Sequence, residues 1–529
     1  MTIGILPDDV LIEVFDFYVD QPGTSQHARE DAWHTLIHVC QRWRRIVFAS
    51  PRRLNLQLLC TNTRSVRKML DIWPELPIVI FTRALGGNSK PQWIEMANVI
   101  AALEQHDRVC SINIQDIPSP LLKILAAIRT SFPALTDLSL WSKDQRAPVL
   151  PDSFLGRSAP RLRKISLEGT PFPGLGKLLL STSDLVSLLL FRIPHSGYIS
   201  PESMVASLSA LTRLEAFCLE FRSPRSRADR EHRRPPPLRC VIVPALTRLQ
   251  LKGDSEYLED IVSRIDAPLL RRIYIRFFNQ LVFDTPQLRY FISRAENFKA
   301  LHHAEVPFHD DHVGITLVPN AMDNHDGIRL HLQILCKPSD WQLASLAQVC
   351  DSALPPSSTL ERLSINGYRR HWEDVGNTQW LELLHPFTSV KDLVLSMKSF
   401  QLVAPALEVP AEESVTGMLP ALQNLFLQGP KPSGPELEAI GKFIAARKLS
   451  GCHVTVYHMD LLGRAYSLDD VIERLLARRS REWKLEYQRG LEGAIENEGK
   501  YKNMWRARAL VLEALLRDKG HEVPRMSGA

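Results

Sequence analysis

The sequence lacks any long apolar run, and this absence argues against a membrane-spanning helix. No stretch of its 529 residues approaches the roughly 18 consecutive apolar residues that such a helix requires. The first residues, MTIGILPDD, also lack the basic start and the apolar core of a secretory signal. We therefore expect neither a membrane partner nor export.

Closely spaced cysteines are missing as well. The chain has eight cysteines, and none forms a Cys-x-x-Cys pair: Cys40, Cys60, Cys110, Cys218, Cys240, Cys336, Cys350 and Cys452. Such spacing is typical of small buried side chains in a reducing compartment rather than of a disulfide framework or a zinc site. The expected location is the cytoplasm, the nucleus or both.

Charge of one sign is not in large excess. The sequence has 64 Lys and Arg against 59 Asp and Glu, and this net charge of +5 does not require a nucleic-acid partner. Hydrophobic residues make up 45% and charged residues 23%, which is typical of a folded globular protein rather than a disordered chain.

Motifs for catalysis are absent too. The segment GTPFPGLGK has the look of a phosphate-binding loop, but Pro171 and Leu178 break the required spacing. In FHDDH, His309 and His312 flank two Asp, but solvated charge is the simpler interpretation because no second ligand set follows. No G-x-S-x-G elbow occurs. We expect no enzymatic activity, no metal and no cofactor, with a thioester-forming cysteine left open as an alternative.

A short phrase does recur: an apolar residue, two variable residues, an apolar one, a variable one and an apolar one. It begins at Val109, Leu135, Leu162, Leu185, Leu214, Leu246, Leu270, Leu360, Val390 and Leu422, and more weakly at Leu301. The stretch IRLHLQI from Ile328 alternates without matching the phrase. Neighbouring copies are spaced by about 23 to 32 residues, which overlaps the spacing of leucine-rich repeats.

The phrase predicts an irregular leucine-rich-repeat solenoid of class α/β. Its alternating end suits a short strand with one face buried, and amphipathic stretches such as PSPLLKILAAIRTSF suit a helix between strands. An ordinary leucine-rich α/β domain is the alternative. The asparagine usual three residues past the phrase is missing, so we expect no ladder of buried asparagines.

The first residues predict helices that are apolar over more than one face. Pro7 followed by Asp8 and Asp9 is a helix-start signal. At 100° per residue, eight apolar residues then cover about 220° of the wheel, against about 100° for a helix packed on one side. They are Phe17, Val10, Val14, Tyr18, Leu11, Phe15, Val19 and Ile12. A second segment from Trp33 is similar. Either both faces pack within the chain, or one of them contacts another protein.

These two segments, LPDDVLIEVFDFYV and WHTLIHVCQRWRRIVFASPRRL, resemble the F-box, the motif that binds the linker subunit of cullin-type ubiquitin ligases. The resemblance implies linker contacts by Leu6, Pro7, Leu11, Val14, Phe15, Leu36, Val39 and Trp43. The continuation NLQLLCTNTRSVRKMLDIWPELPIVI and the later repeats resemble the large F-box-like family of mushroom-forming fungi. The connection DQPGTSQHAREDA is longer than a compact F-box needs, which puts linker binding in question.

The resemblance implies a substrate-recruiting adaptor of an SCF-type (cullin-RING) ubiquitin ligase, whose repeats hold an unknown target protein. The alternative is a scaffold or sensor without a ligase, in which the first helices only cap the solenoid. The expected domains are an F-box-like helical unit (1–55), the solenoid (56–458) and a helical C-terminal extension (459–529).

Two further segments have no sharp assignment. The Arg- and Pro-rich insert at 221–239 is interpreted as a solvated loop, with contact to an acidic or phosphorylated partner as the alternative. Nucleic-acid binding is less favoured because no aromatic residues interleave its arginines. The extension is interpreted either as a cap on the last repeat or as an appendage for a partner.

Overall fold

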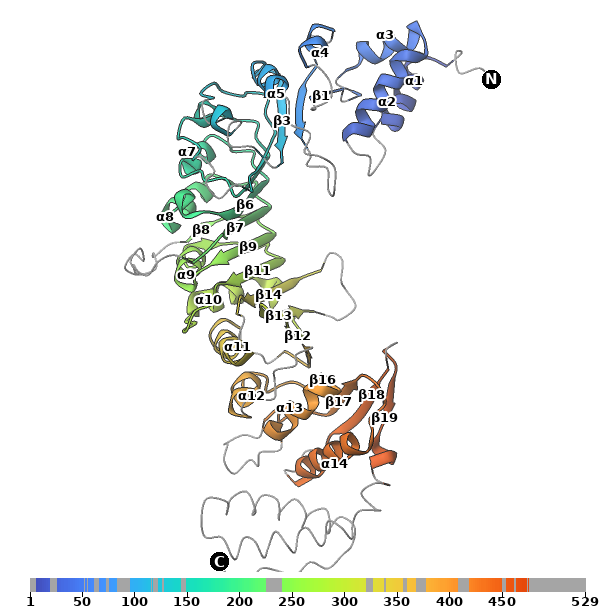
Figure 1. Cartoon of the computed structure of the whole chain (residues 1–529), viewed down its shortest axis with the longest axis vertical. Helices are drawn as coiled ribbons and strands as arrows, with labels where there is room; N and C mark the ends of the chain where they lie inside the picture. Colours follow the sequence, from blue (N-terminus) through green and yellow to red (C-terminus); the bar gives the residue numbers. More distant parts are fainter. Residues whose placement is uncertain are drawn as a thin grey trace, which may run out of the picture. The chain divides into compact units, whose positions relative to one another are not determined.

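The computed structural model of the chain (Figure 1) consists of two compact units. Unit 1 is Met1–Gly253 with Ser263–Leu269, and unit 2 is Asp254–Val262 with Leu270–Ala529. The structure describes residues 6–19, 26–51, 53–54, 56–60, 66–72, 76–82, 96–115, 117, 122–125, 128–143, 149–224, 240–319, 327–336, 339–354, 359–367, 377–407, 418–449, 453–460, 463–472 and 474.

Unit 1 begins with three helices and continues as a parallel sheet. The helices are α1 (Asp8–Val19), α2 (Gln26–Val39) and α3 (Gln41–Ala49). The strands, each paired in parallel with the next, are β1 (Leu58–Cys60), β2 (Ile78–Thr82), β3 (Val109–Ile114), β4 (Asp137–Trp141), β5 (Lys164–Glu168), β6 (Ser187–Ile193), β7 (Ala216–Phe221) and β9 (Arg248–Gly253). A small parallel pair joins β8 (Val241–Ile242) to β10 (Ile265–Asp266).

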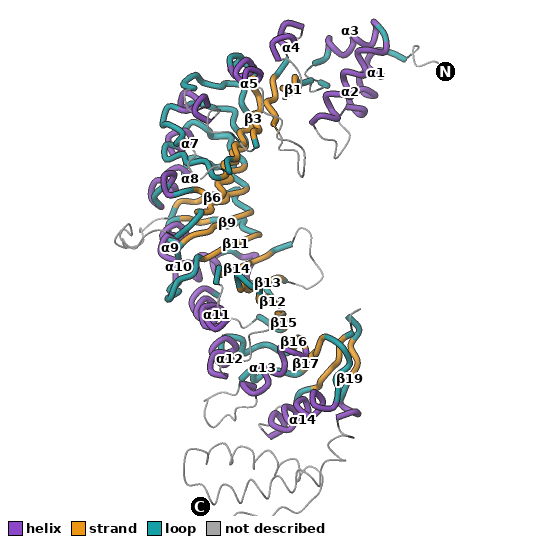
Figure 2. The backbone as a smooth tube through the Cα atoms, viewed as in Figure 1, coloured by secondary structure: helices purple, strands orange, loops and turns teal. Residues whose placement is uncertain are grey.

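Helical connections of unit 1 lie on one side of this sheet, as Figure 2 shows. They are α4 (Val66–Ile72), α5 (Met96–Leu103), α7 (Leu175–Leu179), α8 (Pro201–Leu208) and the 3₁₀ turns η2 (Phe154–Arg157) and η3 (His195–Gly197). Because some connections contain only a 3₁₀ turn among their described residues, the units are less regular than the predicted strand plus helix. The mixed α/β class with a largely parallel sheet is confirmed.

The repeated phrase sets the register of the sheet in unit 1. The apolar residue at the fourth position of the phrase forms one row across the strands, and the apolar residue at its sixth position forms a second row. The rows are Ile112, Leu138, Ile165, Leu188, Phe217 and Leu249, and Ile114, Leu140, Leu167, Leu190, Leu219 and Leu251. All twelve side chains are buried. The alternation therefore places one face of each strand in the core and leaves the intervening residues on the other face.

Unit 2 departs from a simple solenoid. Its elements are α9 (Ser255–Val262), β11 (Arg272–Phe277), α10 (Pro286–Arg294), η5 (Glu296–Phe298), β12 (His303–Phe308), β13 (Val313–Val318), β14 (Arg329–Ile334), α11 (Ser339–Ala353), β15 (Arg362–Gly367), α12 (Asn377–Leu384), β16 (Asp392–Ser396), α13 (Met397–Leu407), β17 (Asn424–Gln428), α14 (Gly434–Leu449), β18 (Thr455–Met459) and β19 (Ala465–Ser467).

The departure is an antiparallel meander formed by β12, β13 and β14. The next strand in the chain after β11 is β12, yet β11 pairs in parallel with β14. β13 lies between β14 and β12 and is antiparallel to both, while β12 pairs in parallel with β15. The weak phrase at Leu301 and the non-matching stretch from Ile328 both belong to this meander. The sequence did not predict β13, because VGITLV does not contain the phrase.

Helix α10 receives its N-terminal cap from a neighbouring helix. Its own N-cap residue, Thr285, makes no side-chain capping bond. Instead, the buried Glu259 carboxylate of α9 accepts hydrogen bonds from the backbone N–H groups of Gln287 at 2.9 Å and Leu288 at 2.8 Å. A carboxylate at the positive end of a helix dipole is favourable, so this contact ties two successive helices of unit 2 together.

The remaining boundary predictions are only partly covered. Residues 225–239 of the insert, and all of the C-terminal extension after Arg474, lie outside the described residues. β19 pairs antiparallel with β18, so the sheet of unit 2 includes residues beyond 458. The three predicted domain boundaries stay predictions. Among the described residues, no helix combines the length and apolarity needed to cross a bilayer.

Candidate interaction surfaces

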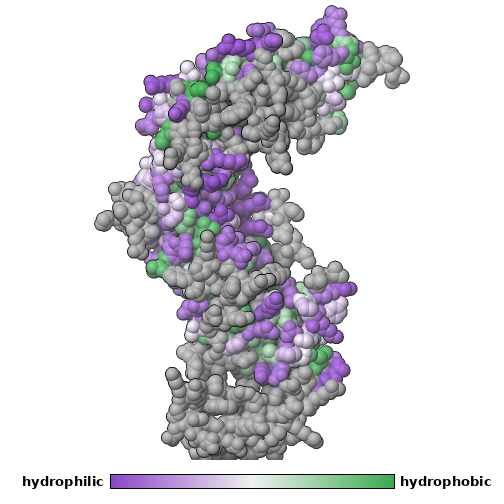
Figure 3. Space-filling model, in the orientation of Figure 1, coloured by the Kyte–Doolittle hydropathy of each residue, from purple (hydrophilic) through white to green (hydrophobic). Residues whose placement is uncertain are grey.

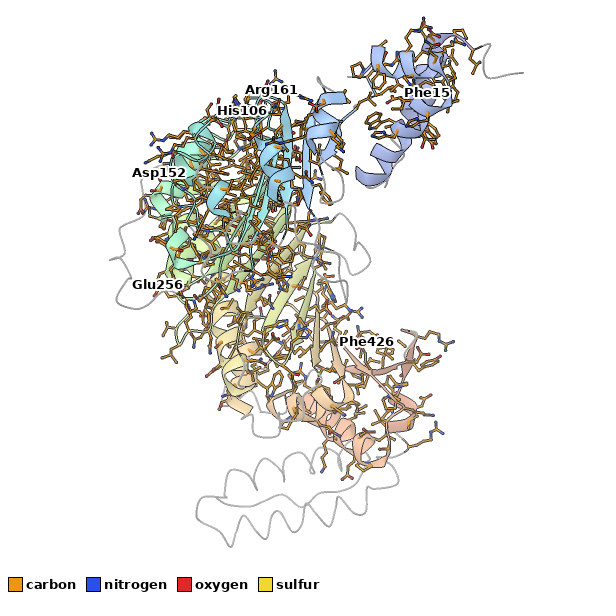
Figure 4. All side chains as sticks on the ribbon, turned by 45° about the horizontal axis from the view of Figure 1, so that its top comes forward. Phe15, His106, Asp152, Arg161, Glu256 and Phe426 are labelled. Atoms are coloured by element: carbon orange, nitrogen blue, oxygen red, sulfur yellow. The ribbon has the colours of Figure 1, made fainter. Side chains whose placement is uncertain are left out.

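One stripe of α1 forms the core of the N-terminal helical unit. Leu11 and Phe15 have no exposed surface, and Val19 is buried with them. The Phe15 ring contacts the Trp43 ring of α3 with their centroids 4.7 Å apart. Figure 4 shows Phe15 among these helices. Spacing of four residues places these α1 side chains on one face, which explains why they share a core.

A second apolar stripe of α1 faces solvent. Val10 is 43% exposed, Val14 44%, Phe17 74% and Tyr18 43%. Positions separated by four, seven and eight residues share a helix face, so these side chains form one continuous stripe. Apolar side chains are visible at the surface of this part of the chain in Figure 3. The surplus apolar helix surface predicted from the sequence therefore corresponds to one buried stripe and one exposed stripe.

Polar contacts from α3 and from Arg53, which follows it, hold α1 in this orientation. The Arg42 guanidinium donates to Asp8 Oδ1 through Nε at 3.0 Å and through Nη2 at 2.6 Å, and Nη2 also donates to the Leu6 carbonyl at 2.6 Å. The Arg53 guanidinium pairs with the Glu13 carboxylate. Because Arg42 contacts both the first turn of α1 and Leu6, two residues before the helix, it ties the start of α1 to α3.

The residues implied by the F-box resemblance fall into two groups. Leu11, Phe15 and Leu36 are buried in the helical unit, so a partner could contact them only if the unit opened. In the free chain these three side chains form part of the core, and their contact with a linker stays a prediction.

The other implied residues are accessible to different degrees. Val14 and Val39 are exposed, Pro7 is exposed, and Leu6 and Trp43 are half-buried. The linker contacts implied by the F-box resemblance do not include Phe17, which has the largest exposed fraction on α1. Its position on the helical wheel, beside Val10 and Val14, could have identified it as part of the same apolar stripe. Linker binding by any of these residues remains a prediction.

The uncovered face of the sheet in unit 1 carries a polar depression of about 350 Å³. Its lining includes the strand-face residues Ser111, Asn113, Ser139, Lys164 and Ser166. The Asn113 side-chain oxygen is buried there without a hydrogen-bond partner in the structure. An acceptor in this state favours a ligand that donates a hydrogen bond. The depression lies on the face opposite the connecting helices.

The described His and Cys residues bear on the metal and thiol alternatives. No group of at least three His, Cys, Asp or Glu side chains there has an arrangement that could hold a metal ion. The rings of His309 and His312 stack with centroids 4.2 Å apart. Burial raises the pKa of the Cys110 thiol to about 11, and it also raises the pKa of Cys350, so both thiols are protonated at neutral pH. Cys452 lies outside the described residues.

Comparison with known proteins yields little. No family model matches the chain. No curated protein matches either. Among solved structures, the leucine-rich repeat-containing protein LegL7 from Legionella pneumophila aligns with 67% of this chain and 92% of its own, at 12% identity and a TM-score of 0.24. At this similarity the match establishes neither a family nor a function. The F-box and the fungal family therefore stay hypotheses that rest on the sequence.

Proposed function

We propose that the chain is a non-catalytic adaptor that joins two proteins. The helical unit would dock to the linker subunit of a cullin-type ubiquitin ligase, and the uncovered sheet faces would hold the protein to be ubiquitinated. The location would be the cytoplasm, the nucleus or both. The exposed stripe of α1 is the observation that carries this proposal, because Val10, Val14 and Phe17 expose apolar surface on the same helix whose other apolar face is buried.

The physical basis of docking is the removal of this stripe from water. Fully burying one large apolar side chain contributes roughly 1.5–3 kcal/mol, before the costs of association are subtracted. Aromatic residues near the centre of an interface supply the largest share of such energy, and Phe17 is the aromatic residue most available on α1. The F-box-like order of residues gives the reason for choosing the ligase linker as partner.

Co-purification of the full chain with the purified linker subunit tests the proposal. The double variant Val14→Asp, Phe17→Asp places charge on the stripe, and both positions are exposed, so the fold should survive. The matched control is Leu180→Asp, Val282→Asp, at apolar positions that are 65% and 68% exposed elsewhere. We expect the first variant to lose the linker and the control to retain it. Retention by both variants would reject the stripe as the docking surface.

A scaffold without a ligase is the second candidate, and one observation favours it. Helix α2 contacts strand β1 within unit 1, and its Trp33 and Ile37 are buried. These contacts are what a cap on the first strand requires. If the wild-type chain does not retain the linker at all, the helices act as a cap and the adaptor proposal fails.

A further inference from the structure

An unusual group of polar side chains lies on one face of the unit 2 sheet, at strand positions that alternate with buried ones. We define the Arg276 cluster as Tyr274 and Arg276 of β11, His331 and Gln333 of β14, and Thr316 of β13. The register pairs Tyr274 with His331, Arg276 with Gln333 and His331 with Thr316, so the five residues are neighbours on three adjacent strands. The residues that alternate with them, such as Ile275 and Leu332, are buried in the core.

Arg276 is held rigidly by neutral partners. Its Nε donates to Gln333 Oε1 at 3.0 Å, and its Nη2 donates to the Tyr274 hydroxyl oxygen at 2.7 Å. The Tyr274 hydroxyl in turn donates to Gln333 Oε1 at 2.5 Å. The guanidinium carbon lies 5.2 Å from the centre of the Tyr274 ring. These contacts fix the plane of the guanidinium without neutralising it.

The Tyr274 ring also packs against His331 on the adjacent strand. It stacks on the His331 ring with centroids 4.5 Å apart and planes at 5°, and His331 Nδ1 lies 2.7 Å from Thr316 Oγ1. The hydrogen-bonded network therefore extends over three strands and leaves little freedom to any member. A guanidinium has five N–H donors, and the two used here leave the others for a ligand. Such a fork matches the oxygens of a carboxylate or a phosphate.

In the described part of the chain Arg276 has only neutral partners. Among the described residues it makes no ion pair, since both of its hydrogen-bond partners are neutral. The positions facing the same way on β11, β13 and β14 include no Asp or Glu, and Glu305 of β12 lies opposite Thr316, at the edge of the cluster away from β11.

Arg362, on the same face of the sheet, is an arginine that already has a carboxylate nearby. Arg362 of β15 lies over the Phe426 ring, with its guanidinium carbon 5.2 Å from the ring centre, and Phe426 is labelled in Figure 4. Its Nη1 is 3.8 Å from Asp392 Oδ2. Arg362 thus resembles Arg276 in strand position and aromatic contact, but it already has a carboxylate nearby.

We propose that the Arg276 cluster binds an acidic segment of a protein partner, with the Arg276 guanidinium pairing with a carboxylate or a phosphate of that segment. The inference deepens the proposed function, because it names the chemistry of the protein held by the sheet face. A protein is favoured over nucleic acid because the Tyr274 ring already lies between His331 and Arg276, so it offers no free face on which a base could stack.

The test is fluorescence anisotropy of the full chain with labelled peptides. The probes are a Glu-rich peptide, a phosphoserine peptide of equal charge and an uncharged Gln-rich peptide of the same length. We expect the wild-type chain to bind one or both acidic probes and to ignore the third. Preference between the acidic probes identifies carboxylate or phosphate as the natural group.

Variants locate the site. Arg276→Gln should weaken binding by about tenfold or more, since a charge-assisted bidentate pair is lost. Arg276→Lys keeps the charge but not the fork, and should recover only part of the affinity. Arg362→Gln removes the same charge from the same face and should change affinity by less than about threefold, because Arg362 is already paired. Circular dichroism and thermal unfolding of each variant check that the fold is retained.

Several outcomes would overturn the inference. These are no binding of either acidic probe, equal losses in Arg276→Gln and Arg362→Gln, or tighter binding of a single-stranded oligonucleotide than of either peptide. Linker co-purification is measured on the same Arg276→Gln protein and should be unchanged. Loss of peptide binding with linker binding intact therefore separates failure of this inference from failure of the adaptor proposal.

Discussion

Phe15 and Phe17 lie two positions apart on α1, and replacing each with alanine should have opposite consequences. Phe15 has no exposed surface and contacts Trp43, whereas Phe17 is 74% exposed. Truncating a buried Phe typically costs about 3–5 kcal/mol, because apolar contacts are lost and a cavity remains. Substitution at an exposed position usually changes stability by less than about 0.5 kcal/mol. Phe15→Ala should therefore destabilise the helical unit, and Phe17→Ala should not.

Amide hydrogen exchange followed by mass spectrometry measures this difference in the full chain. Peptides from α1 and α3 report the free energy of local opening of the helical unit. We expect protection in these peptides to fall strongly in Phe15→Ala and to match the wild type in Phe17→Ala, with the rest of unit 1 unchanged in both.

Binding should show the reverse pattern. If the linker covers Phe17, its truncation removes roughly 2 kcal/mol of docking energy, or about a thirtyfold change in affinity. The reasoning would be refuted if Phe17→Ala lowered protection in the free chain as much as Phe15→Ala. That result would mean that the stripe is covered within the chain itself, and the argument for a docking surface would fail.

Three other substitutions or conditions test the described contacts in unit 2 and unit 1. Glu259→Gln should destabilise unit 2 by about 2 kcal/mol, because an amide cannot accept from both N–H groups of α10 as a carboxylate does; urea unfolding should show a much smaller loss for the exposed Glu296→Gln. Burial and nearby Arg276 lower the pKa of His331 to about 4 from 6.5. Between pH 4 and pH 6.5 the unfolded chain therefore binds a proton that the folded chain does not. The free energy of unfolding should fall as the pH is lowered from 6.5 toward 4, by up to about 3 kcal/mol. Urea titrations of His331→Asn should show a smaller dependence on pH. Gly169 has φ +63° and a Cβ there would lie 2.3 Å from the Ser142 carbonyl oxygen, so Gly169→Ala should lower the thermal midpoint of unit 1, at a cost of at least about 2 kcal/mol. A midpoint equal to that of the wild type would contradict the last expectation.

Local patterns predicted most of the sheet. Every copy of the phrase, including the weak copy at Leu301, overlaps or directly precedes a strand. This success has a simple cause, because alternation of apolar residues depends only on the geometry of a strand with one buried face. The order of β12, β13 and β14 did not follow from the same pattern. Pairing of β11 with β14 is a choice between several strands of similar composition, and sequence spacing alone does not decide it.

The candidate surfaces were harder to predict for the same reason. On α1 the sequence revealed surplus apolar surface, but Phe15 and Phe17 are both apolar and only the packing of α3 determines which one is buried. The Arg276 cluster joins Tyr274 to Gln333 across 59 positions of the chain. The alternating polar residues of RRIYIRF and RLHLQI were visible as a signal, but their meaning depended on a strand register that only the structure supplies.

The two proposed surfaces rest on different forces and on different cores. The α1 stripe would act by removing apolar area from water, which requires close contact and depends little on ionic strength. The Arg276 cluster would act through charge, which is screened by salt over a distance of about 8 Å at physiological ionic strength. Each lies within its own compact unit: the stripe is on a helix held by Arg42, and the cluster is on strands whose alternating residues, such as Ile275 and Leu332, are buried. Because neither surface contributes side chains to the other's core, a chain that has lost one partner should remain able to bind the other, and this independence is what an adaptor between two proteins requires.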